Sequence, residues 1–507
     1  MLDLGRTLVA ATEREPAAEA IVDGERRLSY AELLDSVCRV MGGLQKLGLR
    51  TGDHLVMLLQ NRLEMVVLHW ACQMLGLVST PVNWRIKAEE LDYYLDDAGA
   101  RAVVYQDASA AAVAKSTRAR AIARVATDSD PDATCYFDEM LEVAPAPATP
   151  RANAEAVSLM FYTSGTTGRP KGVPRRHRAE RAAALAHVAQ NCYGYGERTL
   201  GVMPLYHTMG VRSLLSMALI NGCFVCLGRF EPERALQLIE CERVSNLYLV
   251  PTLYHDLLEH PSFEPAKVST VRKLGFAGAP MSDSLLRRAA EAFKPDLFVN
   301  HYGSSEIYTF TINQHAADKP GSAGKAGINT RVRVVKLNST NPADLAEVGE
   351  DGHIIAALDG DESFEGYWKR PDADAKALHE GWYFTGDVGH FDGEGDLFVT
   401  GRVDDMIISG GENVHPAEIE DVLSLYPGIA EVVVAGVPDQ RLGQRITAFV
   451  KRRSEIEASA LDSYCRASRL ADFKRPREYV FVAEIPKSPT GKILRRMLVA
   501  GEYKPEK

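Results

Sequence analysis

The segment Met160-Phe-Tyr-Thr-Ser-Gly-Thr-Thr-Gly-Arg-Pro-Lys-Gly172 leads from an apolar strand pattern into a loop rich in glycine, hydroxyl groups and positive charge. Glycines that permit positive φ and close approach of the backbone to a ligand stand at Gly165, Gly168 and Gly172. Donors for phosphate oxygens are the backbone amides and the side chains of Thr163, Ser164, Thr166, Thr167 and Lys171. The GxxxxGK(S/T) spacing of a Walker A loop is not satisfied. We therefore predict a polyphosphate-binding loop of another kind; the alternative is a hairpin tip rich in Ser, Thr and Gly.

Helix and strand patterns alternate on both sides of this loop. Ser29-Tyr-Ala-Glu32 has the form of a capping box at the start of a helix. Residues 54–59 and 78–82 read as strands, and the apolar spacing of residues 62–75 between them predicts a helix. Beyond Gly401 the pattern changes to a compact α+β unit of about 100 residues. The βαβ alternation favours an α/β fold with parallel sheets covered by helices.

Composition excludes several classes of protein. The chain has 507 residues, 46% of them hydrophobic and 25% charged, with a formal net charge of -10, which gives no support to nucleic-acid binding. Its eight cysteines are scattered, and Cys223 and Cys226 lie in an apolar strand pattern typical of core residues. The first residues lack a signal-peptide pattern, and no apolar stretch is long enough for a membrane span. We expect a cytoplasmic protein with reduced thiols.

Six further motifs follow the loop in order. They read Met203-Pro-Leu-Tyr-His-Thr-Met-Gly210, Phe276-Ala-Gly-Ala-Pro280, Asn300-His-Tyr-Gly-Ser-Ser-Glu306, Gly381-Trp-Tyr-Phe-Thr-Gly-Asp387, Gly401-Arg-Val-Asp-Asp-Met-Ile-Ile-Ser-Gly-Gly-Glu-Asn-Val-His-Pro416 and Pro486-Lys-Ser-Pro-Thr-Gly-Lys492. One such motif is a weak signal, but the ordered series is specific. Over nearly the whole chain it resembles the adenylate-forming superfamily of acyl-CoA synthetases, nonribosomal-peptide adenylation domains and luciferases. Within that superfamily it is most similar to chlorobenzoate- and benzoate-type aryl-CoA ligases.

The resemblance implies a two-step reaction. A carboxylate attacks the α-phosphate of ATP to form an acyl-adenylate and pyrophosphate, and coenzyme A then takes the acyl group and releases AMP. ATP, Mg²⁺ and coenzyme A are therefore expected. The implied fold has a large domain, residues 1–402, of doubly wound α/β subdomains and a small β subdomain. A small mobile α+β domain, residues 403–507, follows a hinge near Asp404, with Asp405 as the rival hinge residue. Homodimers are common in relatives, although nothing in the sequence identifies an interface.

The same resemblance assigns roles to single residues. Lys492, which by itself would be taken for a solvent-exposed lysine, becomes the catalytic lysine, and Glu306 becomes a Mg²⁺ ligand. Asp387 and Arg402 are expected at the ribose. The adenine slot is expected to involve Gly278, Ala279, Pro280, His301 and Tyr302, followed by Gly303, Ser304 and Ser305. Coenzyme A would approach Gly410, Gly411 and Glu412, with its phosphates near Arg475, Arg477 and Arg85.

His207 is expected to face or gate the acyl pocket. The other wall residues implied are Ala184, Thr208, Met209, Tyr248, Tyr308 and Thr309, together with Ala279 and His301. Several of these are bulky or polar, and no acid stands near His207 to pair with a substrate ammonium. We therefore predict a short, flat, aromatic or heteroaromatic acid such as a benzoate or a furoate, rather than an amino acid or a long alkyl chain.

Two other expectations complete the sequence-based interpretation. The basic residues 169–181 are predicted to form mainly a solvated helix face; they are Arg169, Lys171, Arg175, Arg176, Arg178 and Arg181. The alternative functions are an aliphatic acyl-CoA synthetase, a luciferase-like or carrier-protein-loading enzyme, and a non-catalytic adenylate-binding relative. Decayed motifs would favour the last of these, but the motif residues are all present.

Overall fold

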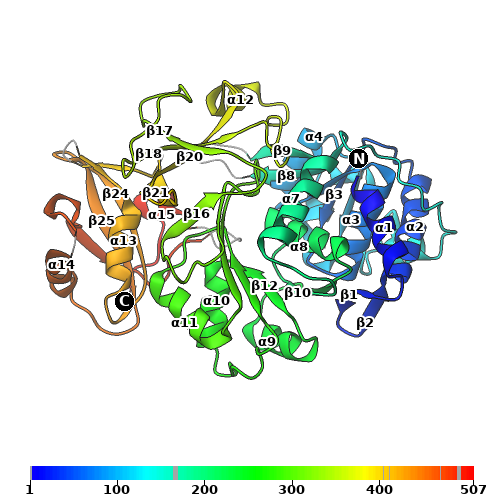
Figure 1. Cartoon of the computed structure of the whole chain (residues 1–507). Helices are drawn as coiled ribbons and strands as arrows, with labels where there is room; N and C mark the ends of the chain where they lie inside the picture. Colours follow the sequence, from blue (N-terminus) through cyan, green and yellow to red (C-terminus); the bar gives the residue numbers. More distant parts are fainter. Residues whose placement is uncertain are drawn as a thin grey trace.

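A seven-stranded sheet carries the predicted phosphate loop (Figure 1). The computed structural model describes residues 3–163, 170–403, 405–409, 412–468, 470–487 and 493–506. The strands that precede the loop pair in parallel, and the two strands that flank it form an antiparallel hairpin. In spatial order the sheet contains β7 (Cys135–Tyr136), β6 (Ala123–Ala126), β5 (Ala102–Tyr105), β3 (His54–Leu58), β4 (Val78–Pro81), β8 (Val157–Thr163) and β9 (Lys171–Arg176).

The two helices that the sequence predicts in this part, after Ser29 and at residues 62–75, are both present. Ser29 accepts a hydrogen bond from the backbone of Glu32, whose side chain bonds back to Ser29, so the predicted capping box starts the second helix. The helices are α1 (Leu4–Arg14), α2 (Tyr30–Lys46), α3 (Leu63–Leu75), α4 (Ala88–Ala98), α5 (Asp107–Lys115), η1 (Ala119–Ala121), α6 (Phe137–Leu141) and α7 (His177–Gln190).

A fourteen-stranded sheet forms the centre of the molecule. The section from β1 through β14 is parallel except for the β1–β2 hairpin, and the section from β14 to β17 is antiparallel. In spatial order it contains β17 (Val332–Val335), β18 (Gly352–Ala357), β20 (Trp382–Phe391), β21 (Leu397–Arg402), β16 (Ser322–Ala326), β15 (Thr311–Asn313), β14 (Leu297–Tyr302), β13 (Lys273–Phe276), β12 (Asn246–Leu249), β10 (Arg198–Gly201), β11 (Cys223–Cys226), β1 (Glu19–Asp23) and β2 (Arg26–Ser29), while β19 (Leu378–His379) pairs with β20.

Helices cover the central sheet and join it to the first. They are α8 (Thr208–Leu219), α9 (Pro232–Cys241), α10 (Pro251–Glu259), α11 (Asp283–Phe293) and α12 (Pro371–Ala377). One hydrophobic core contains Trp70 of α3, Phe161 of β8 and Phe224 of β11, so it holds the phosphate-loop hairpin against the central sheet. Cys223 and Cys226 are free and buried, as predicted for core cysteines, and they pack into different cores because positions three apart in a strand face opposite ways.

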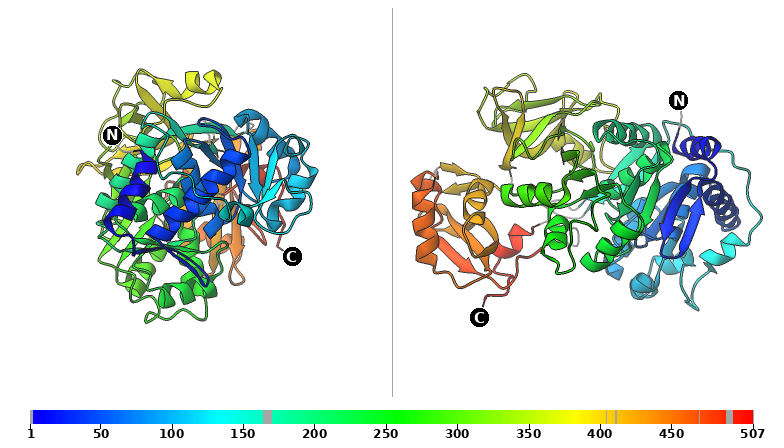
Figure 2. Two further views of the ribbon diagram at one scale, coloured as in Figure 1. Left: turned by 90° about the vertical axis from the view of Figure 1, so that its right-hand side faces the viewer. Right: turned by 60° about the horizontal axis from the view of Figure 1, so that its bottom comes forward.

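The residues after Gly401 build a separate five-stranded sheet with its own core. It lies at the opposite end of the molecule from α1 and α2 (Figures 1 and 2). In spatial order its strands are β23 (Glu412–Val414), β22 (Ile407–Ser409), β25 (Gly443–Arg452) and β24 (Ile429–Asp439), with β26 (Glu478–Phe481) beside β25. Its helices are α13 (Pro416–Ser424), α14 (Ala458–Ala467), η2 (Asp472–Lys474) and α15 (Arg495–Val499).

The mixed α/β class predicted from the sequence is therefore confirmed. Pro416 occupies the first turn of α13, as its fixed φ and missing N–H allow. Among the described residues, no helix is both long and apolar enough to span a bilayer. The proposed hinge residue Asp404 lies outside the described residues.

Candidate active site

Two tyrosines hold the ends of the phosphate loop. Thr163 of β8 faces Lys171 of β9 across the hairpin. The hydroxyl of Tyr162 donates to Asp97 Oδ2 at 2.7 Å, and the hydroxyl of Tyr93 donates to the carbonyl oxygen of Pro170 at 2.6 Å. The predicted phosphate donors Ser164, Gly165, Thr166, Thr167 and Gly168 lie outside the described residues. The hairpin thus positions both ends of the loop at the edge of the seven-stranded sheet.

Lys171 and Glu306, which are 135 positions apart, meet at Tyr367. The Lys171 ammonium lies 3.9 Å from the centre of the Tyr367 ring, whose hydroxyl donates to Glu306 Oε1 at 2.7 Å. Burial lowers the pKa of Lys171, and the carboxylate of Glu306 acts against that shift. An ammonium and a carboxylate on one aromatic side chain form a site that suits a phosphate with its cation.

A tight turn presents the Glu306 carboxyl group. Ser304 Oγ accepts from the backbone N–H of Glu306 at 3.2 Å, while the backbone oxygen of Glu306 accepts from Phe364 N–H at 2.9 Å. A Cβ atom at Gly303 would lie 2.1 Å from the carbonyl oxygen of Tyr308, so only glycine fits there. The carboxyl group of Glu306 is 6% exposed yet hydrogen-bonded, and it is well suited to a hard cation that prefers carboxylate oxygen.

Arg175 corrects the prediction of a solvated basic face. It lies in β9, is fully buried, and donates from Nε to Glu180 Oε1 at 2.8 Å and from Nη1 to the Glu306 carbonyl oxygen at 2.7 Å. The expectation failed because the segment through Arg176 is a strand, in which alternate side chains point into the protein. Arg175 therefore supports the turn that presents Glu306, through its hydrogen bond to the Glu306 carbonyl oxygen.

Asp387 lies beside Tyr302 and Arg402, as the ribose assignment requires. Asp387 and Arg402 face each other on β20 and β21, and Arg402 Nε is 3.2 Å from Asp387 Oδ1. The Tyr302 hydroxyl donates to Asp387 Oδ2 at 2.6 Å. Burial, and then the negative charge of Asp387, raise the pKa of Tyr302, so its hydroxyl remains a donor. Glu306 and Arg402 both act electrostatically on Lys171, so these three charged groups lie near one another.

We expect Asp387→Asn to raise the KM for ATP by a larger factor than it lowers kcat. An amide keeps the size but supplies only one acceptor oxygen and no charge, so the KM for ATP should rise by about 10- to 100-fold. Initial rates of pyrophosphate exchange over a range of ATP concentrations check this. The control is Asp359→Asn, an exposed residue paired with Arg331; an equal rise in the control would contradict a ribose role.

Two neighbouring residues of β14 that were expected at the same adenine slot, His301 and Tyr302, point to opposite faces of the strand. Tyr302 faces Asp387, whereas the neighbouring His301 is buried against His187 and Tyr248, with ring centroids 5.1 Å from each. Adjacent residues of a strand point to opposite faces. Gly278, Ala279 and Pro280 form an exposed turn after β13, with Gly278 at φ +83°. His301 thus lies with the residues predicted for the acyl pocket, and a Cβ atom at Gly278 would lie 3.9 Å from Met209 of the same set, whereas Tyr302 faces Asp387.

The predicted acyl residues converge from four elements. Ala184 comes from α7, Thr208 and Met209 from the start of α8, Tyr248 from β12, and Tyr308 and Thr309 from the turn after β14. His207 is the N-cap residue of α8. Burial lowers the pKa of His207 to about 4, so the ring is neutral near pH 7. The set therefore combines aromatic and small side chains with an uncharged imidazole.

Asn61 fastens the segment that leads to His207. Its Nδ2 donates to the carbonyl oxygens of Gly201 and Met203, both at 2.8 Å, and its Oδ1 accepts from Leu205 N–H at 2.9 Å. The side chain is 3% exposed. Because three buried backbone groups depend on one amide, this residue sets the course of the loop before α8.

We expect Asn61→Ala to destabilise the protein by about 3 kcal/mol and to raise the KM for the acid more than that for ATP. The reason is that the freed backbone groups let the loop carrying His207 shift. Denaturant unfolding and initial-rate kinetics check this. Asn153→Ala is the control because Asn153 caps an exposed turn; equal losses in the two variants would remove the positioning role of Asn61.

The residues expected to contact coenzyme A differ in their solvent exposure and in whether they are already ion-paired. Arg85 is exposed, with its guanidinium 3.9 Å from the Trp84 ring centre. Arg475 is 8% exposed and is ion-paired with Asp462, whereas Arg477 is exposed. Glu412 is exposed at the start of β23. Gly410, Gly411 and the predicted catalytic Lys492 lie outside the described residues. Arg85 and Arg477 are therefore the better candidates for a phosphate of coenzyme A.

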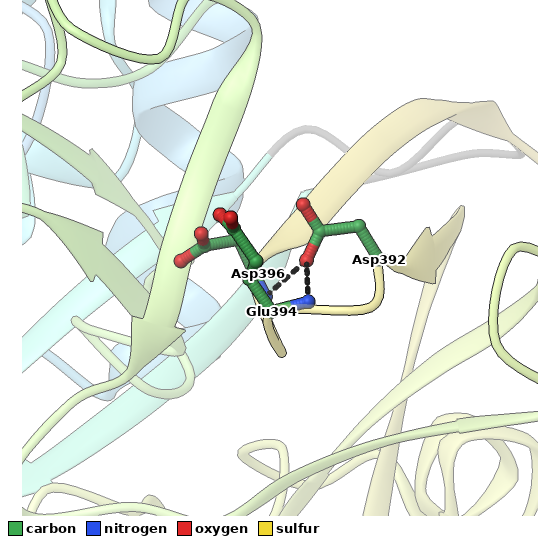
Figure 3. A group of neighbouring side chains, drawn as sticks. All are labelled: Asp392, Glu394 and Asp396. Atoms are coloured by element: carbon green, nitrogen blue, oxygen red, sulfur yellow. Dashed lines mark hydrogen bonds between the residues drawn. The ribbon is translucent and has the colours of Figure 1, made fainter.

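A cluster of three acidic residues, separate from Glu306, lies in the turn between β20 and β21 (Figure 3). Its members are Asp392, Glu394 and Asp396. Lys319 Nζ lies 2.5, 2.6 and 2.5 Å from their respective carboxylates. Asp392 also accepts backbone hydrogen bonds from Glu394 and Asp396. The Lys319 ammonium is already paired with all three carboxylates and offsets part of their charge, which distinguishes this cluster from Glu306.

Sequence reasoning missed several residues that build the site. They are Asn61, Arg175, Glu180, His187, Asn191, Arg212, Tyr367 and Tyr383. Tyr367 follows the glycine of Phe364-Glu-Gly-Tyr-Trp368, an aromatic cluster that carried the available signal. Tyr383 lies within the motif Gly381–Asp387, and for the other residues no local pattern indicated that these polar side chains are buried.

The sequence model of the AMP-binding enzyme family matches residues 8–368 of the chain. The chain belongs to the AMP-binding enzyme family. The model of the AMP-binding enzyme C-terminal domain also matches residues 418–492. Among AMP-binding enzymes, a 4-chlorobenzoate–CoA ligase of Arthrobacter sp. is 32% identical over 498 residues, which are 96% of this chain and 92% of the relative. A long-chain-fatty-acid–CoA ligase of Mycobacterium tuberculosis is 33% identical over 513 residues, covering 98% of each chain.

Solved AMP-binding enzymes share the whole fold. ATP-bound MatB from Rhodopseudomonas palustris superposes with a TM-score of 0.89 at 27% identity, covering 99% of each chain. The o-succinylbenzoate coenzyme A synthetase from Bacillus subtilis, in complex with ATP and magnesium, superposes with a TM-score of 0.84 at 27% identity over 97% of this chain and 98% of the other. The adenylate-forming class implied by the motif series is confirmed. This AMP-binding enzyme is an acyl-CoA ligase that uses ATP.

Proposed function

We propose that the enzyme joins a small aromatic or heteroaromatic carboxylic acid to coenzyme A through an acyl-adenylate. The observation that carries this proposal is that Lys171 and Glu306 meet on Tyr367. Asp387 and Arg402, the ion pair that we assign to the ribose, lie near them in space. These groups together match the triphosphate, cation and sugar of ATP bound in one extended orientation. The acyl residues lie on the opposite face of β14 from Tyr302, so an acid there would approach the α-phosphate from the side.

In the first half-reaction the protein holds ATP while the acid attacks. Glu306 would hold Mg²⁺, which neutralises phosphate charge when bound. Lys171 and the phosphate loop would hold the β- and γ-phosphates, and Asp387 would accept both ribose hydroxyls. Lys492 would bring its ammonium to the carboxylate and the α-phosphate oxygen, where negative charge develops in the transition state.

In the second half-reaction the thiol must reach the same carbonyl carbon. We infer that residues 403–507 form a small domain that turns about a hinge near Asp404 relative to residues 1–402. This turn would withdraw Lys492 and bring the segment of Gly410, Gly411 and Glu412 towards the pantetheine. Such a domain movement lets one site serve two transition states of different shape. Arg85 and Arg477 would meet the phosphates of coenzyme A.

The ring-shaped substrate is supported by the side chains around the acyl site. Tyr248, His301 and Tyr308 are large and buried, and a flat acid stacks on such rings with little loss of conformational entropy. An aliphatic acid is the second candidate, because a relative of the same overall similarity is named for long-chain fatty acids.

A panel of acids tests the assignment. Benzoate, 2-furoate, hexanoate, decanoate and palmitate would each be assayed for AMP release that requires ATP, Mg²⁺ and coenzyme A together. We expect ring acids to give the highest kcat/KM. Activity on palmitate or decanoate without activity on ring acids would refute the ring assignment, while AMP release without thioester formation would point to another acceptor.

A further inference from the structure

A cluster of polar side chains lies at the inner side of the predicted acyl residues. This inner polar cluster consists of His187 and Asn191 from the end of α7, Arg212 from α8, Tyr248 from β12 and His301 from β14. His187 is fully buried, and Arg212 and His301 are each 2% exposed. The ring centroids of His187, Tyr248 and His301 are 4.7 to 5.1 Å apart. Buried polar groups are normally hydrogen-bonded, so a buried group that has no partner requires an explanation.

Arg212 lacks a close ionic partner. It donates to the Tyr248 hydroxyl and, at 2.7 Å, to Thr309 Oγ1, both of which are neutral acceptors. Across the described ranges of the chain, no carboxylate oxygen lies within 4.0 Å of its guanidinium. Glu180 and Glu362 act on it only at longer range. A buried guanidinium in this setting is costly unless its remaining donor finds an acceptor.

Asn191 determines which nitrogens of the two histidines carry protons. Its Nδ2 donates to the His187 carbonyl oxygen at 2.7 Å, which fixes the orientation of the amide. The same Nδ2 lies 3.0 Å from His187 Nδ1, which must therefore accept, leaving a proton on His187 Nε2. Asn191 Oδ1 lies 3.2 Å from His301 Nε2, which must donate, leaving a lone pair on His301 Nδ1.

Both histidines remain neutral, as these tautomers require. Burial, and then the positive charge of Arg212, hold the pKa of His187 and of His301 well below the ordinary value. Three buried atoms then have no partner among the residues that the structure describes: Arg212 Nε, His187 Nε2 and His301 Nδ1. The first two are donors and the third is an acceptor. A hydroxyl group, which accepts two hydrogen bonds and donates one, is the complement of two donors and one acceptor. A water molecule would serve the same three atoms when no hydroxyl is bound.

We propose that the inner polar cluster binds a hydroxyl group carried by the substrate acid, at the end opposite to the reacting carboxylate. The acid would then be a hydroxy-substituted ring acid. This inference rests on the proposed function, because it takes the acyl chain to lie among Tyr248, His301 and Thr309. Arg212 and His187 would be specificity-determining residues that hold the distal hydroxyl and so align the carboxylate with the α-phosphate.

Other substituents satisfy the cluster less well. A methyl group would leave all three atoms without partners, and each buried unsatisfied polar group is costly. A carboxylate would accept from Arg212 and His187 but would face the lone pair of His301 Nδ1 with another lone pair. Sites built to hydrogen-bond a hydroxyl discriminate strongly against analogues that lack it.

Matched pairs of acids test the proposal with the full-length enzyme. The pairs are 4-hydroxybenzoate with 4-methylbenzoate and 3-hydroxybenzoate with 3-methylbenzoate, which differ little in shape. We expect the hydroxy acid to have a kcat/KM at least about tenfold higher in one of the pairs. A ratio of one or below in both pairs would overturn the proposal.

Two variants test the residues. Arg212→Met keeps the length of the side chain and removes its donors, and His187→Phe keeps the ring contacts and removes Nε2–H. Each should reduce the hydroxy-to-methyl ratio by about threefold to tenfold or more. Ser216→Ala is the matched control, since Ser216 lies one turn further along α8 and donates to the Arg212 carbonyl oxygen; it should leave the ratio unchanged. If Arg212→Met and His187→Phe lowered kcat/KM for both acids of a pair equally, the residues would be structural and the inference wrong. If Arg212→Met failed to fold, the ratio in His187→Phe would decide.

Failure of the ring assignment can be distinguished from failure of this inference. If alkanoates support AMP release and no ring acid does, the ring assignment is wrong. The same variants would then be tested with another matched pair, 6-hydroxyhexanoate and heptanoate, in place of the ring acids. A preference for the hydroxy acid that the variants abolish would then still support the role of the cluster. Equal rates for those two acids would overturn it.

Discussion

Replacing Lys492 by alanine is expected to abolish most adenylate formation while leaving the fold intact. Negative charge builds up on the α-phosphate and the attacking carboxylate in the first transition state, and a positioned ammonium stabilises it by about 10²- to 10³-fold. Transfer from a supplied acyl-adenylate to coenzyme A should survive better, because that step does not need the lysine near the phosphate. Pyrophosphate exchange measures the first half-reaction, and thioester formation from synthetic adenylate measures the second.

Lys487→Ala provides the matched control, five positions earlier. Lys487 is paired with Glu431 on β24, so its charge already has a structural partner. We expect this variant to retain most of both half-reactions. If Lys492→Ala reduced both half-reactions by the same factor, the idea that a moving small domain presents this lysine to only one of them would be untenable.

The second large effect is expected for Glu306→Gln. The amide retains one oxygen and the size of the side chain but loses the charge that a divalent cation requires. Adenylate formation should fall by about 100-fold, and the Mg²⁺ concentration needed for half-maximal rate should rise. Mg²⁺ titrations of pyrophosphate exchange at saturating ATP would show both changes. Tyr367→Phe should give a much smaller loss, because it removes only the hydroxyl that donates to Glu306.

Asp392→Asn is the control for this change. It is the same exchange of carboxylate for amide, made in the acidic turn (Figure 3) whose carboxylates pair with Lys319. The Mg²⁺ requirement should remain that of the unmodified enzyme. Should Asp392→Asn raise the requirement while Glu306→Gln leaves it unaltered, the cation would have to be assigned to that turn.

Lys171 and Glu306 share a partly buried setting. Glu306 is 6% exposed and Lys171 is half-buried, and the Tyr367 side chain contacts both. Because the effective dielectric in such a setting is lower than that of water, the two charges would act strongly on a phosphate and a cation.

The sequence predicted much of the local structure. The capping box at Ser29 and the strand that leads into the phosphate loop formed where expected. Such features depend on residues within a few positions of each other. The compact α+β unit predicted beyond Gly401 is also present, with β24, Ile429–Asp439, paired to β25 along its length.

Side-chain surroundings were predicted less well. The segment around Arg175 looked like a basic solvated face, yet its guanidinium is fully buried beneath Glu306. His301 was expected at both the adenine and the acyl group, and the pleat of β14 places it with His187 and Tyr248. Charge and spacing along one segment carry no information about what packs over it.

The ordered motifs by themselves determined the family, the use of ATP and the class of reaction, because loops that hold phosphate need particular residues at short, fixed separations. Only the tertiary structure decided that Lys171 and Glu306 share Tyr367, that Asn61 fastens the loop before His207, and that Asn191 sets the protonation of two buried histidines. Those contacts join residues far apart in the chain. Their distances and burial follow from how the sheets and helices pack, which no local pattern encodes.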